Sequence, residues 1–160
     1  MSTYFSPNNE TSRSNHLLPH TRTVTDSEAT EAVQDLMPLA ITLGLRAEAY
    51  SADQVILAMD WAPSLCTANG ILHGGVIMAL ADSAGGACAL LNLPEGSIGT
   101  TTIESKTNFL GAVRGGAVSA TATPLHRGGT TIVVETAVRD DVGKLIAKVT
   151  QTQLVLRPRN

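Results

Sequence analysis

The pattern of apolar and polar positions predicts one long helix among strands. From Gly74 to Leu93 nearly every residue is apolar. A helix that is apolar on every face is typical of one buried inside a larger structure. A run of about 20 residues also meets the length of a membrane span, but Asp82 in its middle, its glycines and the lack of flanking basic residues disfavour that reading. The sequence therefore predicts a central helix that is buried in a protein core.

Strand-like segments lie on both sides of this helix. Residues 45–61 predict two strands around a turn at 51–53, because apolar residues alternate from Val55 to Trp61. After a turn at 93–96, we expect four more strands at 97–110, 117–125, 130–139 and 145–156, separated by Gly-rich or Asp-rich turns. Before all of them, Asp26 or Ser27 caps a short helix that Pro38 ends or kinks. This order predicts an α+β domain, with an antiparallel sheet curling around the central helix.

Length and composition narrow the class of protein. The chain of 160 residues fits one domain, which we assign to 26–160. Residues 1–25 are rich in Ser, Thr, Asn, Pro and His and read as a flexible or loosely packed tail, without a signal peptide or anchor. The net charge of −3 and the scattered basic residues disfavour a nucleic-acid partner. The chain has only two cysteines, which fits a reducing, cytoplasmic setting.

Neither a metal site nor a catalytic thiol is expected. His16 and His20 lie four residues apart, but no carboxylate or thiol is spaced to complete a metal site with them. Cys66 and Cys88 have no obvious partner base, so small hydrophobic roles suit them better.

Gly74 and Gly75 begin the central helix and form the first chemical candidate. Glycine costs about 1 kcal/mol relative to alanine inside a helix, so its presence suggests that something approaches the backbone closely. The first amides of a helix have no intrahelical acceptor and lie at the positive end of its dipole, where they suit an oxygen that develops negative charge. The alternative is that these glycines only let the helix pack tightly against the sheet.

Asp82 is the second candidate. It lies too far into the helix to cap it, and a carboxylate buried without partners would be strongly destabilising. We therefore expect Asp82 to be held by a hydrogen-bond network or to face a cleft that uses its basicity. It follows Gly74 by eight residues, roughly 12 Å along a helix axis, which is more than one reacting carbonyl can bridge. A symmetric dimer, in which each helix start meets the partner's aspartate, would bring the two features together.

A resemblance to a known family is carried by three stretches, GILHGGVIMALADSAGGACAL, TTIESKTNFL and HRGGTTIVVETAVRDDVGKLIAKVTQTQLVL. They resemble the hotdog-fold acyl-CoA thioesterases of the phenylacetate-degradation (PaaI-like) branch, from about Met37 to the C-terminus. The resemblance implies a hotdog fold, with an antiparallel sheet of five to six strands around a long central helix. It also implies an acyl-CoA substrate, no separate cofactor, and composite sites in a homodimer that usually pairs into a homotetramer.

The same resemblance implies roles for individual residues. Asp82 acts as a general base on water or as a nucleophile on the thioester carbonyl, and the Gly74 amide polarises that carbonyl across the dimer interface. His73 orients the thioester or the loop, although it could equally hold the turn by hydrogen bonds, and Thr102 positions the attacking water. Further contacts with coenzyme A or the acyl group are expected from Asn69, Gly75, Ser83, His126, Arg127 and Gly128.

Two of these contacts are less specific than the rest. Arg127 beside glycine amides suits a phosphate, but His126 to Gly129 also reads as an ordinary hairpin turn. Relatives often carry Asn where this chain has Thr67, so the contact expected of the neighbouring Asn69 is open.

Three other functions compete with hydrolysis. A hydratase or dehydratase of the same fold would act on an enoyl or 3-hydroxyacyl thioester, but its second catalytic motif is not found in the sequence. A non-catalytic acyl-CoA sensor would bind without turnover, and the presence of Asp82 argues against it. A structural assembly protein would not bind coenzyme A derivatives at all.

Overall fold

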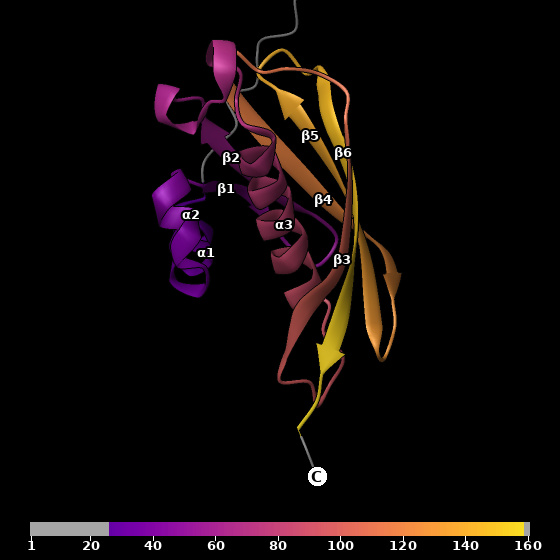
Figure 1. Cartoon of the computed structure of the whole chain (residues 1–160). Coiled ribbons are helices and arrows are strands. Elements are labelled where there is room, and N and C mark those ends of the chain that lie inside the picture. The colour runs from indigo at the N-terminus through magenta and orange to yellow at the C-terminus, as the bar shows by residue number, and fades with distance from the viewer. Residues whose placement is uncertain (1–25, 159–160) are drawn as a thin grey trace, which may run out of the picture.

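The computed structural model describes residues 26–158 as an α+β fold with a central helix. One antiparallel sheet of six strands has the order β1-β2-β4-β5-β6-β3, and α3 lies along one of its faces (Figure 1). The predicted fold class is therefore confirmed, while the predicted tail at 1–25, with His16 and His20, lies outside the described residues. The elements are α1 (Ser27–Leu36), α2 (Pro38–Leu43), β1 (Arg46–Tyr50), β2 (Val55–Asp60), α3 (Gly74–Leu90), β3 (Gly99–Phe109), β4 (Ala117–Arg127), β5 (Thr131–Asp140) and β6 (Leu145–Leu156).

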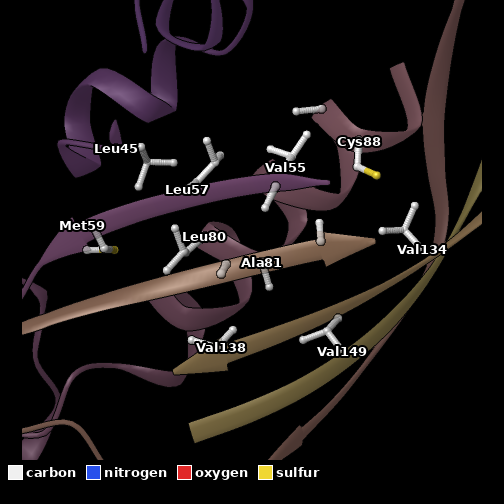
Figure 2. Close-up of a cluster of buried hydrophobic side chains, with 14 of the residues drawn as sticks. Leu45, Val55, Leu57, Met59, Leu80, Ala81, Cys88, Val134, Val138 and Val149 are labelled. Atoms are coloured by element: carbon white, nitrogen blue, oxygen red, sulfur yellow. The ribbon is translucent and has the colours of Figure 1, made fainter. Parts of the chain in front are cut away.

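The core lies between α3 and the sheet. Leu80, Ala81 and Cys88 of the helix belong to one buried cluster with Leu57 of β2 and Val134 of β5 (Figure 2). Small residues dominate the sheet side of the helix, and they allow its backbone to come close to the strands. A core with few aromatic residues is the consequence.

One face of α3 is open. Gly75, Met78 and Asp82 recur at helical spacing and are exposed in the described chain. The prediction of a helix buried on every side is wrong for this single chain, because one sheet can cover only one side of a helix. No helix in residues 26–158 is long and apolar enough to cross a bilayer.

The N-terminal helical region ends its first helix before Pro38, as predicted, but a second helix follows that was not predicted. The side chain of Asp26 caps α1 as expected, accepting the Ala29 N–H at 2.9 Å. Pro38 then begins a second helix instead of kinking the first. Met37 is extended, with φ −131° and ψ 91°, because a residue before proline is disfavoured in the helical region, whereas proline itself fits the first helical position.

The strand β3 forms one edge of the sheet. It pairs with β6 along one side, and within residues 26–158 no strand pairs with its other side. None of its residues is buried, and Ile103 and Phe109 are large apolar side chains exposed on it. A long unpaired edge that exposes large apolar side chains is an association surface that proteins normally cover.

Two neighbouring glycines of α3 provide a test of this packing. A Cβ added at Gly85 would clash with the side-chain amide of Gln151, whereas one at Gly86 would meet nothing within 4 Å. We expect Gly86→Ala to raise the free energy of unfolding by up to about 1 kcal/mol, through helix propensity alone. The free energy of unfolding of Gly85→Ala should be at least about 1 kcal/mol lower than that of Gly86→Ala, because the buried amide of Gln151 must shift. Urea unfolding of both variants measures the difference, and equal stabilisation would contradict the packing described.

Candidate active site

Asp82 and Thr102 come together at the junction of α3 and β3. The Thr102 hydroxyl donates a hydrogen bond to Oδ1 of Asp82 at 3.1 Å, and the Gln151 side-chain amide donates to the same oxygen at 3.3 Å. Among the described residues, no hydrogen-bond donor reaches Oδ2. Asp82 is thus held by the expected kind of network, but it is exposed in this chain instead of buried, because it lies on the face of α3 that the sheet leaves open.

A second glutamine sets the direction of the Thr102 hydroxyl. Gln153 is 1 % exposed, and its Nε2 donates to Thr102 Oγ1 at 2.7 Å. Its Oε1 accepts a hydrogen bond from the Thr100 hydroxyl at 3.1 Å. Since the amide N–H already occupies a lone pair of the Thr102 oxygen, the hydroxyl proton of Thr102 is free to point at Asp82.

Both glutamines were missed in the sequence analysis. In β6, Val149, Gln151, Gln153 and Val155 alternate and are all buried. Two amide side chains at the core positions of a strand are unusual, because a buried polar group needs a partner. The two glutamines at alternating core positions could be seen in the sequence, and they indicate a polar site on the inward face of β6.

The start of α3 is shaped by His73. Its Nδ1 accepts the Gly75 N–H at 2.9 Å, so His73 is the N-cap of the helix. A neutral ring with an accepting Nδ1 carries its proton on Nε2. The Gly74 N–H donates to no acceptor among the described residues and remains available to a ligand. This geometry fits the turn-holding role of His73 that the sequence left open.

The loop before α3 is fixed by two side chains that were not predicted. Arg114 donates to the Asn69 carbonyl at 2.8 Å, and the Trp61 indole N–H donates to the Gly70 carbonyl at 3.2 Å. Asn69 has a φ of 62°, in the left-handed region that Asn tolerates better than most residues. Asn69 therefore contributes a conformation to the loop as well as a side chain.

The predicted phosphate contact lies at the other end of α3. Arg127 forms an ion pair with Asp53 at 2.9 Å and donates to the Ala52 carbonyl, which also accepts from the side chain of Asn92 just beyond α3. A helix of this length places that end about 24 Å from Gly74. The structure of one chain does not bring His126, Arg127 or Gly128 to Asp82.

Cys88 is not a nucleophile in this fold. Burial raises the pKa of its thiol to about 11, although the Arg127 guanidinium acts in the opposite direction. At neutral pH the thiol is protonated and the reactive thiolate is scarce.

Two hollows flank the pair formed by Asp82 and Thr102. The larger one, about 380 Å³, has apolar walls from the α1–α2 junction, the end of α3 and the start of β3. The smaller one has a volume of about 330 Å³. Besides Asp82 and Thr102, it is lined by Met78, Ala79 and Ser105. Ser83, which was predicted to contact substrate, is only 7 % exposed and lines neither hollow.

Comparison with known proteins assigns the family. Residues 69–147 match the family model described as the thioesterase superfamily, a stretch that includes the start of α3, Asp82 and Thr102. The chain belongs to this superfamily. The fold is the hotdog fold of these enzymes, and the prediction of a thioester-hydrolysing enzyme is confirmed at the level of the family.

Individual relatives agree with this assignment. The Pseudomonas aeruginosa protein PA1618 is 31 % identical over 73 % of this chain and 82 % of its own. The solved structure of a Q49A variant of PA1618, described as a thioesterase, has a TM-score of 0.74 and covers 84 % of this chain and 96 % of that one. A 1,4-dihydroxy-2-naphthoyl-CoA hydrolase from Listeria monocytogenes is 28 % identical over 69 % of this chain and 89 % of its own.

The network around Thr102 predicts a specific effect on stability. Thr102→Val leaves the buried Nε2 of Gln153 without its acceptor, which costs about 1–3 kcal/mol. Thr102→Ser keeps the hydroxyl, so its free energy of unfolding should be within about 0.5 kcal/mol of the wild-type value. Urea unfolding at neutral pH measures both variants. If the valine variant is as stable as the serine variant, the hydrogen bond from Gln153 does not contribute as described.

Proposed function

We propose that this protein hydrolyses an acyl-CoA thioester to the free acid and coenzyme A at composite sites of a homodimer. The single observation that carries the proposal is the setting of Asp82, a carboxylate in the middle of an open apolar helix face. Two donors hold its Oδ1, and no donor within the described part of the chain reaches its Oδ2. The name of the Listeria relative, a CoA-thioester hydrolase, supports the same substrate class.

The chemistry follows from the free oxygen and the free amide. Acting as general base, Asp82 takes a proton from a water molecule, whose oxygen attacks the thioester carbon. The negative charge that develops on the carbonyl oxygen is stabilised by the Gly74 N–H at the positive end of α3. The C–S bond then breaks, and the proton held by Asp82 passes to the departing thiolate. If Asp82 instead attacks the carbon directly, the C–S bond breaks and coenzyme A leaves as the thiolate. Water then hydrolyses the resulting anhydride, which releases the acid and restores the Asp82 carboxylate.

A second copy of the chain completes the site in this proposal. Gly74 and Asp82 are separated by roughly 12 Å along α3 and cannot reach one carbonyl within a chain. The open face of α3 lies next to β3, whose outer edge is unpaired in the described residues. A two-fold dimer that covers both surfaces would bring the Gly74 of one subunit toward the Asp82 of the other.

We place the acyl group in the larger of the two hollows. Leu36, Met37, Leu90 and Ile98 provide its apolar wall, and Asp82 lies at its border. Binding pockets of this kind combine apolar walls with a few polar groups at the reacting end. The α1–α2 junction therefore becomes part of the substrate pocket.

Several finer predictions remain part of this proposal. They are the PaaI-like branch, the pairing of dimers into a homotetramer, a cytoplasmic location, and the contacts of Asn69, Gly75, His126, Arg127 and Gly128 with substrate. Ser83 is not among these contacts, because it is buried in the described chain. Both cysteines are free thiols in the described structure, which fits a reducing compartment.

Release of free thiol from a panel of aliphatic and aromatic acyl-CoAs tests the proposal. We expect turnover by the wild type and a fall in kcat of about 10²–10⁴-fold in Asp82→Asn, since a general base or nucleophile is lost while the shape is kept. Circular dichroism and size-exclusion chromatography serve as controls for folding and oligomeric state.

Two outcomes would count against hydrolysis at Asp82. A folded Asp82→Asn protein with wild-type turnover would remove the basis of the proposed mechanism. Tight binding of acyl-CoA by the wild type without any turnover would instead favour a sensor.

A further inference from the structure

We propose that Gln151 is a positioning residue for Asp82 and that it leaves Oδ2 as the reacting oxygen of that carboxylate. The inference rests on the proposed hydrolysis and adds to it the residue that orients the catalytic group and the atom that reacts.

Gln151 occupies a position where an amide is unfavourable for the fold. Its side chain is 0 % exposed on the inward face of β6, and its Oε1 has no hydrogen-bond partner among the described residues. A buried acceptor without a donor destabilises a protein, and a methionine could fill a similar volume without that defect. The glutamine provides one thing that methionine cannot, the hydrogen bond from Nε2 to Oδ1 of Asp82.

Gly85 makes room for this contact. The Gln151 amide lies against the backbone of α3, in the space that any side chain at position 85 would fill. Its orientation follows from chemistry, because a flipped amide would turn Oε1 toward the carboxylate oxygen and lose the one hydrogen bond that the side chain makes within residues 26–158. The close approach of α3 and β6 at Gly85 therefore directs the Gln151 Nε2–H at Asp82 from the side of the sheet.

Two donors from different strands converge on one oxygen. Thr102 reaches Oδ1 from β3 and Gln151 reaches it from β6, at 3.1 and 3.3 Å. Two fixed donors restrict rotation of the carboxylate, which reduces the ordering needed when substrate binds. Oδ2 receives no donor among the described residues, so its lone pairs remain available for the proton of water or for the thioester carbon.

The test replaces Gln151 by methionine and uses Thr136→Val as the matched control. Thr136 is also 0 % exposed, with a hydroxyl that has no partner among the described residues, and it makes no hydrogen bond to Asp82. Both replacements remove a buried unpaired oxygen, so both should keep or raise the urea midpoint. Only Gln151→Met should lower kcat, by about tenfold or more, with KM within about twofold of wild type.

The separation of kcat from stability distinguishes positioning from a structural role. A glutamine that only filled space would leave kcat per folded site unchanged on replacement by methionine. A kcat of Gln151→Met within about twofold of wild type, or an equal loss in Thr136→Val, would therefore overturn the inference.

The same assay separates this inference from the proposed function. If the wild type releases no thiol from any acyl-CoA, the proposed function fails, and the positioning role falls with it. If the wild type is active, Asp82→Asn is inactive and Gln151→Met is as active as wild type, the function stands and only the positioning role is wrong.

Discussion

A carboxylate in an apolar helix must keep hydrogen-bond partners, and this requirement organises the structure around Asp82. The helix packs on the sheet through small residues, which brings β3 and β6 close enough for Thr102 and Gln151 to reach the same oxygen. Gln153 then orients the Thr102 hydroxyl from within the core. This one network accounts for the glycine at position 85, the two inward glutamines, and Thr100 and Thr102 of β3.

The exposed surfaces of the chain complement that network. One side of α3 and the edge strand β3 are open, and both carry apolar side chains such as Met78, Ile103 and Phe109. The hollows beside Asp82 open on the same side of the molecule as Thr102, Met78 and Ser105. In the proposed dimer these surfaces become interior, and the free amide at the start of one helix complements the free carboxylate oxygen on the other.

Local sequence patterns predicted the limits of the strands well, but they predicted the burial of individual residues less well. The four strands after α3 begin and end within a few residues of their predicted limits, because alternation and glycine turns are local signals. Asp82 was expected to be buried, since an unbroken apolar run does not tell which side of a helix its own sheet will cover. Pro38 was expected to end or kink a helix, and α1 does end before it, but the new helix that begins at Pro38 was missed, although proline fits the first position of a helix.

The site was predicted only in part for a related reason. Gly74, Asp82 and Thr102 stood out through their type and through a family resemblance. Gln151 lies 69 residues from its partner Asp82, and Gln153 lies 51 residues from Thr102. Pairings over such distances depend on the register between β3 and β6 and on the approach of α3, which no local pattern specifies.

The composite site is the central claim, and subunit complementation tests it most directly. Gly74→Pro removes the N–H, and proline fits the first helical position while the extended His73 before it is compatible with proline. The ring also adds carbon next to the exposed Phe109 side chain, which lies 3.2 Å from a Cβ at this position and must shift slightly. Gly74→Pro and Asp82→Asn proteins should each be nearly inactive alone. After their subunits are mixed through co-expression, about a quarter of wild-type turnover should return, since half of the dimers would hold one intact site of two. A mixture as inactive as either variant alone would show that both groups act within a single chain, and would contradict the account.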